Sequence, residues 1–320
     1  MRCRVAVTGA TGFIGGHLVT RLAERGDEVR GIVRPDSPRA APAGLTVVRA
    51  PLQPGPLREA FDGADIVVHL AGVISALDPQ AYNAINVAGT RAVASAAASV
   101  GARLVHISSL AAAGPAPATA PRCEEDVPNP LTPYGTSKLA GEDVVKSTPG
   151  LRWVVLRPGV VYGPGDRALW TLFRLASHGV LPLIGRCDAA YTFIYVDDAV
   201  RAIEGAIDVD VEGDVVFVGH PQPVTARRLL IAIQTALGGR AVAIRFPNAV
   251  ARAIAAAGDL AGRIAARPMP LNRWRYRELS AEGFVCRVDR LRERLGVVAE
   301  VELQEGISRT AEWYRREGWI

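Results

Sequence analysis

Residues 5–15 read Val5-Ala6-Val7-Thr8-Gly9-Ala10-Thr11-Gly12-Phe13-Ile14-Gly15, and this stretch decides the fold. The pattern predicts a buried strand, a glycine turn and the start of a helix that Gly26 ends. Gly9 permits the tight turn, Gly12 lets backbone amides approach a pyrophosphate, and Gly15 lets the helix pack closely on the strand. The positive end of the helix faces the phosphates. We therefore expect a dinucleotide-binding turn; the alternative is a glycine-rich turn in an α/β protein without a ligand.

Strands and helices are expected to alternate after this turn. Further buried strands are predicted at residues 28–33, 45–49, 65–70, 103–107 and 153–157. Helices are predicted near 57–61, over 80–100, and from Pro133 with Thr132 as the N-cap. This alternation implies an α/β fold with a doubly wound parallel sheet, a Rossmann fold, whose ligands bind at the carboxyl ends of the strands. Residues 111–130, rich in alanine and proline, are expected to form a loop beside that edge.

The alternation loosens after about residue 165. We expect helices at 168–178, 198–207, 225–237 and 247–266, and extended segments or strands at 192–196, 214–218 and 241–246. Asp197 is expected to be the N-cap of the helix that starts at residue 198. The predicted organisation is a dinucleotide-binding Rossmann domain over 1–164, with later inserted strands near 192–218. A smaller α/β C-terminal lobe, mainly over 165–320, is expected to bind the substrate.

Composition places the chain among globular proteins. Hydrophobic residues make up 49% and charged residues 22% of its 320 residues, so disorder is not expected. The net charge of +5 is local, because residues 263–294 hold nine arginines against four acidic residues. We interpret this basic stretch as a solvated face of the C-terminal lobe; the alternative is an anion-binding or membrane-surface patch. No aromatic side chains are interleaved with it in a repeating pattern, so nucleic acid is not an expected partner.

The cysteines argue for a reduced compartment. Cys3, Cys123, Cys187 and Cys286 lie far apart and form no Cys-x-x-Cys pair, which disfavours both a metal site and a disulfide framework. The first strand begins almost at the N-terminus, leaving no room for a signal peptide, and no apolar run approaches the ~20 residues of a spanning helix. We expect a cytoplasmic protein with no transmembrane segment. The acidic run 124–126 is better explained as a solvated loop than as a metal site.

Cofactor preference is read at the end of the second strand. An acidic residue there holds the ribose 2′-hydroxyl of NAD, whereas a basic residue accommodates the 2′-phosphate of NADP. This strand ends at Val33 and is followed by Arg34, with Ser37 and Arg39 just beyond. The sequence thus favours NADP(H) over NAD(H). The alternative for Arg34 is an ordinary surface arginine after a strand.

Tyr134 and Lys138 carry the predicted chemistry. They lie four residues apart on a predicted helix, so they share one face. A lysine ammonium beside a tyrosine favours the phenolate, lowering the tyrosine pKa from about 10 toward neutral pH. Ser109, at a strand's carboxyl end, can donate to a substrate carbonyl oxygen while a nicotinamide gives or takes the hydride. Tyr-x-x-x-Lys alone is common, but after a glycine turn and a strand ending in Ser-Ser it indicates an oxidoreductase.

At this point the chain resembles an extended short-chain dehydrogenase/reductase, of the NAD(P)-dependent epimerase/dehydratase-like group. The resemblance covers about the first 200 residues. It rests on these motifs in order: Thr8 to Gly15, His69-Leu70-Ala71-Gly72, Asn86-Val87-Ala88-Gly89-Thr90, Ser108-Ser109, Tyr134 to Lys138, Leu156-Arg157-Pro158 through Tyr162-Gly163-Pro164, and Val196-Asp197-Asp198.

The resemblance implies that Ser109, Tyr134 and Lys138 form a catalytic triad. Gly114 favours Ser109 over Ser108, because the family's active serine or threonine lies five residues before the glycine that closes the segment. Family members are often dimers through helices like 80–100 and 133–147, which leaves a homodimer open. The expected cofactor-binding residues are Gly9, Thr11, Gly12, Phe13, Ile14, Arg34, Leu52, Leu70, Ala71, Gly72, Ile107, Tyr134, Lys138 and Pro158. No metal ligands are expected.

Two departures from the family pattern bear on the substrate. Nucleotide-sugar members usually carry an asparagine and an arginine that help to hold the sugar nucleotide, where this chain has Val160 and Tyr191. Sugar-nucleotide dehydratases place Asp-Glu after the active residue, whereas Leu110-Ala111 follows Ser109 here. The chain is thus closer to the dihydroflavonol-reductase and 3β-hydroxysteroid-dehydrogenase branches, which also have a strand-end arginine resembling Arg34.

Three hypotheses follow from these residues. The leading one is an NADP(H)-preferring oxidoreductase that interconverts a secondary alcohol and a ketone on a small, apolar substrate. The second is a nucleotide-sugar epimerase that keeps NAD tightly bound and uses the basic stretch 263–294 in place of the missing anchors. The third is a non-catalytic dinucleotide-binding subunit or sensor, against which the intact triad argues.

Overall fold

The core of the molecule is a seven-stranded parallel sheet. The computed structural model describes residues 2–37 and 45–320, so the predicted contribution of Arg39 lies outside the described residues. The strand order is β11-β6-β5-β4-β1-β2-β3, and it reverses between β1 and β4. The strands are β1 (Arg4–Thr8), β2 (Glu28–Val33), β3 (Thr46–Arg49), β4 (Ile66–His69), β5 (Arg103–Ile107), β6 (Trp153–Pro158) and β11 (Asp214–Val218). This is the expected doubly wound Rossmann fold, which confirms the predicted fold class.

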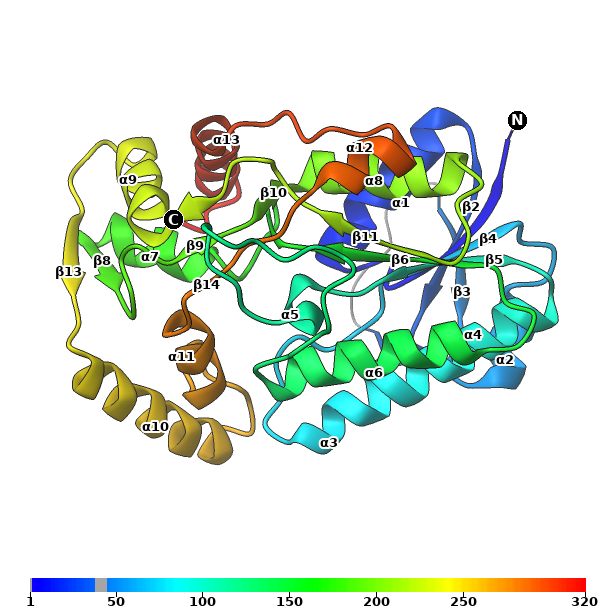
Figure 1. Ribbon diagram of the computed structural model, residues 1–320, viewed down its shortest axis with the longest axis horizontal. Coiled ribbons are helices and arrows are strands. Elements are labelled where there is room, and N and C mark those ends of the chain that lie inside the picture. Colours follow the sequence, from blue (N-terminus) through cyan, green and yellow to red (C-terminus); the bar gives the residue numbers. More distant parts are fainter. Residues whose placement is uncertain (1, 38–44) are drawn as a thin grey trace.

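Helices cover both faces of this sheet (Figure 1). On one face, α1 (Phe13–Arg25), α8 (Val196–Asp208) and α12 (Asp289–Leu295) bury their apolar sides. On the other face lie α2 (Pro54–Ala60), α4 (Thr90–Ser99) and α6 (Pro133–Ser147). Strand β1 contributes to both cores, because Val5 and Val7 face one layer and Ala6 the other. Its apolar run, buried on both sides, is typical of a central parallel strand.

The long helix predicted over 80–100 is interrupted. It consists of α3 (Pro79–Tyr82), a π-helical segment η1 (Asn83–Gly89) and α4. The interruption holds Asn86, which is buried and whose side chain bonds the backbone of Val73 and the Oγ of Ser137. Because these partners lie outside the helix, nothing in the 3.6-residue periodicity could reveal the π-turn.

The N-cap predicted at Asp197 is wrong. Helix α8 begins at Val196, its N-cap residue is Tyr195, and no side chain caps it. The carboxylate of the next residue, Asp198, instead accepts hydrogen bonds from the backbone of Glu300 and Val301. Asp198 therefore ties α8 to the C-terminal segment. The cap predicted at Thr132 is confirmed, since its hydroxyl accepts from the Gly135 amide at 3.4 Å.

A buried ion pair joins α6 to the sheet. The carboxylate of Glu142, on α6, accepts from Nε and Nη2 of Arg157, on β6, at 2.9 and 2.7 Å. Ser108, directly after β5, donates to the same carboxylate at 2.5 Å, and Lys146 adds a fourth contact at 3.3 Å. Both members of the pair are almost fully buried. These contacts hold the pKa of Glu142 below its usual value although burial alone would raise it.

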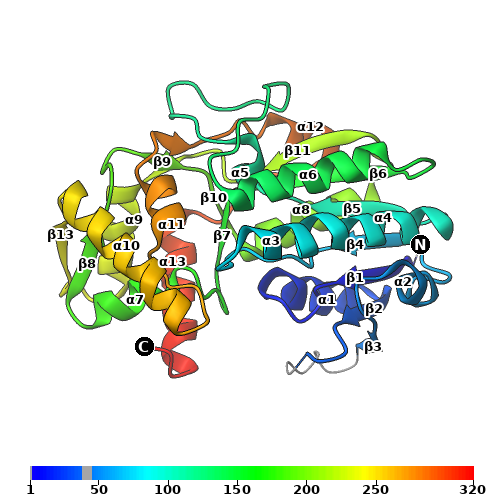
Figure 2. The same cartoon turned by 90° about the horizontal axis from the view of Figure 1, so that it is seen from below.

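The remaining elements build a second lobe at one end of the sheet (Figures 1 and 2). Short strand pairs and helices surround an apolar core that includes Phe173, Leu181, Ile233 and Tyr314. The helices are α7 (Trp170–Ser177), α9 (Ala226–Ala236), α10 (Asn248–Ile264), α11 (Arg273–Leu279) and α13 (Leu303–Arg316). The strands are β7 (Val160–Tyr162), β8 (Val180–Leu183), β9 (Ala190–Tyr191), β10 (Phe193–Tyr195), β12 (Val224–Thr225), β13 (Val242–Arg245) and β14 (Gly283–Phe284). No helix among the described residues is long and apolar enough to cross a membrane.

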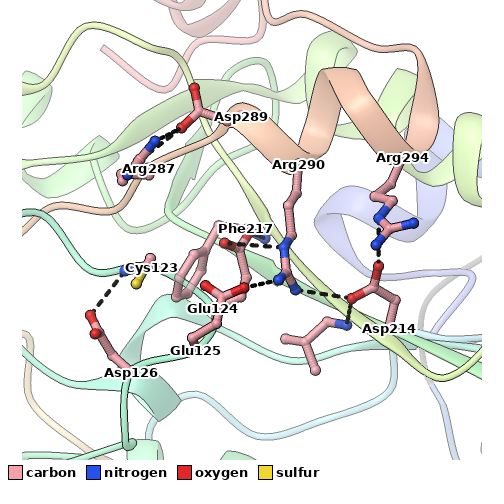
Figure 3. Close-up of polar contacts among 11 residues, drawn as sticks. Cys123, Glu124, Glu125, Asp126, Asp214, Phe217, Arg287, Asp289, Arg290 and Arg294 are labelled. Atoms are coloured by element: carbon pink, nitrogen blue, oxygen red, sulfur yellow. Dashed lines mark hydrogen bonds and ion pairs between the residues drawn. The ribbon is translucent and has the colours of Figure 1, made fainter.

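The loop predicted over 111–130 is partly ordered by tertiary contacts. Its first three residues belong instead to a one-turn helix, α5 (Leu110–Ala113), and the rest forms bridges to residues 284 and 286. Glu124 is buried, and its carboxylate accepts from the Phe217 amide on the edge strand β11 (Figure 3). Arg290, on α12, forms ion pairs with Glu125 and Asp214 in the same cluster. The prediction of a solvated acidic loop is therefore wrong for Glu124, which seals the sheet edge.

Two neighbouring glycines of α1 give a sharp test of the turn. A Cβ at Gly15 would lie 2.1 Å from the carbonyl oxygen of Gly9, whereas one at Gly16 would meet nothing within 4 Å. We expect Gly15→Ala to cost at least about 1–3 kcal/mol and to weaken dinucleotide binding, because α1 must move off the turn. Gly16→Ala should leave binding intact and stabilise the helix by about 0.5–1 kcal/mol. Thermal unfolding with NADPH titration compares them; equal behaviour of the two variants would contradict this account.

Candidate active site

The glycine turn between β1 and α1 forms an open cradle. Gly9 has φ +74°, and a Cβ there would lie 2.8 Å from the Ala71 nitrogen. A Cβ at Gly12 would meet only the Gly9 carbonyl oxygen, so the backbone is otherwise bare at this point. Gly12 is also the N-cap residue of α1, and no side chain caps the helix. The free amides of the first turn are thus suited to a pyrophosphate, and the cradle fits a dinucleotide.

The other residues predicted to bind a cofactor lie along the same edge of the sheet. Leu70, Ala71 and Gly72 follow β4, Ile107 ends β5 and Pro158 ends β6. Since parallel strands end at one edge, these segments face the cradle. Thr11, Phe13 and Ile14 occupy the turn and the first turn of α1, all half-buried. Leu52 lies beyond β3, where its side chain packs against Gly89 of η1.

Arg34 is exposed at the end of β2, as the sequence indicates. A second arginine, Arg49, stands beside it at the end of the neighbouring strand β3. Nη1 of Arg49 donates to the carbonyl oxygens of Pro35 at 3.0 Å and Arg34 at 3.4 Å. Sequence reasoning missed Arg49, because only the parallel pairing of β2 with β3 brings the two arginines together.

Ser109 and Tyr134 meet where β5 ends and α6 begins. The Ser109 hydroxyl lies near enough to the Tyr134 phenol to favour its ionised form, and the Ser109 oxygen accepts a hydrogen bond from the Ala111 amide at 3.2 Å. Burial raises the pKa of Tyr134 to about 12, outweighing the opposing effect of Ser109. The expected lowering of this pKa is therefore wrong for the free protein. Tyr134 keeps its proton at neutral pH, so it is a proton donor in this state.

Lys138 points from α6 toward the strand ends rather than toward the phenol. Its Nζ donates to the Ile107 carbonyl oxygen at 2.6 Å and lies 3.9 Å from where a Cβ at Gly72 would be. The side chain is buried, and burial lowers its pKa to about 8 against the opposing charge of Glu142. The ammonium is thus held among backbone groups beside the cradle, within the region a dinucleotide ribose would enter.

The choice between the two serines has a structural counterpart. Ser108 donates its hydroxyl to Glu142 within the buried ion-pair network, whereas Ser109 is half-buried and lies near Tyr134. Of the two serines, Ser109 is therefore the one whose hydroxyl is not engaged by the ion pair. The Glu142–Arg157 network was missed by sequence reasoning, although a charged residue inside an apolar strand is a usable signal.

A row of hydrogen bonds among buried polar side chains supports this edge of the sheet. Thr8 bonds Nδ1 of His69 at 2.7 Å, and Nε2 of His69 lies 3.1 Å from the hydroxyl of Thr90. Thr90 donates to the Asn86 carbonyl at 2.7 Å. Burial, with a smaller contribution from Lys138, lowers the pKa of His69 to about 3, so its ring is neutral. These hydrogen bonds hold β1, β4 and η1 in position relative to one another.

Aromatic and apolar side chains lie around Tyr134 and around Leu110, which follows Ser109. Tyr82 lies with its ring 6.2 Å from that of Tyr134. Tyr191 stacks on Phe284 at 6.4 Å, and both pack against Leu110 and its neighbours. Glu278 of α11 accepts from Thr132 at 3.2 Å and contributes to raising the pKa of Tyr134. Sequence reasoning missed Glu278, because α11 reaches the site only through the fold.

Comparisons with known proteins agree with this geometry. The family model described as the NAD dependent epimerase/dehydratase family matches residues 5–219. A ceramide reductase from Caulobacter vibrioides is 32% identical, over 99% of this chain and 96% of its own length. A 2-alkyl-3-oxoalkanoate reductase from Shewanella oneidensis is 28% identical, over 95% and 84%.

A solved structure shows the same architecture with its cofactor. The UDP-glucose 4-epimerase of Thermus thermophilus, in complex with NAD, is 27% identical and superposes with a TM-score of 0.78 over 98% of this chain and 99% of that one. Reductases and epimerases thus share this fold. The chain belongs to the NAD-dependent epimerase/dehydratase family, the extended short-chain dehydrogenases/reductases, and is an NAD(P)-dependent enzyme.

Proposed function

We propose that this enzyme interconverts a secondary alcohol and a ketone on an apolar substrate that carries an aliphatic chain, with Ser109, Tyr134 and Lys138 as its catalytic residues. The observation that carries the proposal is that Ser109 lies beside Tyr134, while Lys138, four residues further along the same helix, reaches the strand end next to the glycine cradle. The similarity to a ceramide reductase and a 2-alkyl-3-oxoalkanoate reductase supports a ketone or alcohol on an alkyl-bearing molecule.

The residues divide the reaction among them. A bound reduced nicotinamide supplies the hydride for ketone reduction. Tyr134, protonated at neutral pH, donates its proton to the carbonyl oxygen, and Ser109 donates a hydrogen bond to the same oxygen as negative charge develops on it. The positive charge of Lys138, four residues along α6 from Tyr134, favours the phenolate that forms when Tyr134 loses its proton, while its ammonium donates to the Ile107 carbonyl oxygen and not to the phenol. Oxidation of the alcohol runs through the same groups in reverse.

We propose that residues 165–320 form the substrate-binding lobe, with 1–164 as the dinucleotide-binding domain. Val160 and Tyr191 stand where sugar-nucleotide enzymes carry polar anchors. Both are half-buried, and Tyr191 packs on Phe284 in an apolar cluster. Side chains of this kind favour an apolar ligand, since they offer few hydrogen bonds to a sugar.

We propose NADP(H) as the preferred cofactor. Arg34 and Arg49 lie together at the ends of β2 and β3, and β2 is the strand that follows α1. Two guanidinium groups suit the 2′-phosphate of NADP. The family is described as NAD dependent, and the epimerase of similar structure holds NAD. The proposed preference for NADP(H) therefore rests on the two arginines alone.

A nucleotide-sugar epimerase remains the second candidate because of Arg275. This arginine, on α11, acts on the pKa of both Tyr191 and Asp166, so it lies close to the substrate side of the site. It is paired with Glu278 at 3.3 Å, which offsets its charge. Calorimetric titration with UDP-glucose separates the candidates: retained NAD together with sugar-nucleotide binding favours the epimerase, and exchangeable NADPH without it favours the reductase.

Tyr134→Phe tests the catalytic assignment. Losing the proton donor should lower kcat for reduction of a long-chain 3-oxo compound by about 10²–10⁴-fold, with NADPH binding unchanged. Tyr82→Phe is the matched control, because it removes a hydroxyl from the neighbouring ring. It should stay within a few-fold of the parent enzyme. Full turnover by Tyr134→Phe would eliminate the proposed mechanism.

Lys138 gives the site a pH dependence. Its pKa of about 8 means that the ammonium form, which supports phenolate formation, dominates below that pH and is lost above it. We expect kcat/KM for ketone reduction to fall above pH about 8. Lys138→Met should lower the rate and remove this alkaline limb. A limb that persists in Lys138→Met must belong to another group.

Arg34→Ala tests the cofactor preference. Loss of one phosphate contact should raise the Kd for NADPH by about tenfold and leave that for NADH unchanged. Arg58→Ala, at an exposed arginine of α2, is the control and should change neither constant. Fluorescence titration of the reduced cofactors measures both. A parallel loss of NADPH and NADH affinity would show that Arg34 does not read the 2′-phosphate.

A further inference from the structure

Helix α10 lies at the outer end of the second lobe, beside α11 (Figures 1 and 2). Its buried residues are Ala251, Ala255 and Gly262, so only a narrow stripe of small residues packs inward. The rest of its 17 residues lie at the surface or are only partly covered. Because only alanine and glycine are buried on this helix, its larger side chains remain partly or largely exposed among the described residues.

Those larger side chains are aliphatic. Val250, Ile254, Leu260 and Ile264 are all exposed, Leu260 by 62% and Ile264 by 80%. Together with Val242 and Ile244 of the preceding strand β13, they make six of the fourteen large hydrophobic side chains exposed on the described part of the chain. Scattered exposed apolar residues are ordinary, but a concentration on one helix and its leading strand marks an interaction surface.

This apolar surface continues toward the active site. Leu77, in the loop 72–78 that follows β4, comes within 3.2 Å of where a Cβ at Gly262 would be. Leu77 and Ile74 are both exposed. The same loop is tied to the site, because the Ala76 amide donates to the hydroxyl of Tyr82, whose ring neighbours Tyr134. Aliphatic surface therefore leads from α10 to the edge of the site.

The charges on this surface are almost all positive. Residues 240–267 contain five arginines and a single acidic residue, Asp259, which is paired with Arg273 at 3.3 Å. Elsewhere in the basic stretch, Arg290 and Arg294 are paired with Glu125 and Asp214 beside the sheet edge (Figure 3). The basic stretch thus divides between α10–α11 and α12 and does not form a single face (Figure 1). All of its arginines except Arg290 are exposed, as expected for solvated side chains.

Aliphatic and cationic side chains on one helix fit the surface of an anionic bilayer, where apolar residues enter the lipid boundary and arginines meet headgroup phosphates. A second copy of the chain fits less well, because a two-fold contact through α10 would bring its arginines against their own copies.

We propose that α10, with the loop 72–78, docks this enzyme on an anionic phospholipid bilayer, so that an alkyl-bearing substrate passes from the lipid to Tyr134 along the adjoining aliphatic surface. Docking stands independently of the reaction; only the substrate's passage rests on the proposed function.

Flotation of the full chain with vesicles tests docking without any assay of activity. We expect the protein to float with vesicles of phosphatidylcholine and phosphatidylglycerol, to stay behind with phosphatidylcholine alone, and to detach at high salt. Ile264→Glu should reduce binding strongly. Ile231→Glu, at an isoleucine of α9 that is 53% exposed, is the matched control and should bind like the parent.

The charge component has its own variants. Arg263→Gln with Arg267→Gln should weaken binding to the anionic vesicles by about 25-fold, since each arginine near the surface contributes roughly a factor of five. Arg58→Gln should have no effect. Absence of flotation, equal flotation with neutral vesicles, or equal loss in Ile231→Glu would overturn the proposal.

Two further readouts separate docking from the reaction and from self-association. Turnover of a water-soluble short-chain ketone should be unchanged in Ile264→Glu, while turnover of a ketone embedded in vesicles should fall. Sedimentation should give the same mass for Ile264→Glu and the parent. A dimer that dissociates on this substitution would assign the surface to a second copy and overturn docking.

Discussion

The buried ion pair between Glu142 and Arg157 is the interaction on which the rest of the site depends. Helix α6 carries both Tyr134 and Lys138. The Glu142–Arg157 ion pair fastens α6 to β6, and the hydrogen bond from Ser108 fastens it to the end of β5. A buried carboxylate is tolerated only when its oxygens are fully bonded, and here four donors supply those bonds. Taking away one partner of such a pair typically costs about 3–5 kcal/mol. The positions of Tyr134 and Lys138 therefore depend on a charged pair to which neither residue belongs.

Burial governs the chemistry as strongly as it governs the packing. It raises the pKa of Tyr134 and lowers that of Lys138, and it keeps His69 uncharged. Each shift favours the neutral form, as desolvation must. In the free site, Tyr134 is consequently a proton donor, and the nearby Lys138 ammonium has a lowered pKa. This state is suited to ketone reduction, in which the tyrosine gives up its proton only as charge develops on the substrate oxygen.

Reductases and epimerases share this architecture, and in this chain the second lobe adds its own side chains to the edge of the sheet. The Rossmann half presents the glycine turn together with Ser109, Tyr134 and Lys138, while Glu278 of α11 bonds Thr132 at the start of α6 from the lobe. Differences among relatives are therefore expected in the lobe's side chains. In this chain those side chains are mainly apolar, and the aliphatic surface of α10 lies on the same lobe.

The sequence by itself determined the sheet, the glycine cradle and the residues grouped around it, because these depend on local patterns. Apolar runs of strand length, glycines at fixed spacing and a four-residue Tyr-to-Lys interval are all visible along the chain. The tertiary structure alone decided where Lys138 points, that Arg49 joins Arg34, that Glu278 reaches the site, and that Glu124 seals an edge. These contacts join residues far apart in sequence or depend on burial. Neither periodicity nor propensity reports them, since both describe only a residue's neighbours along the chain.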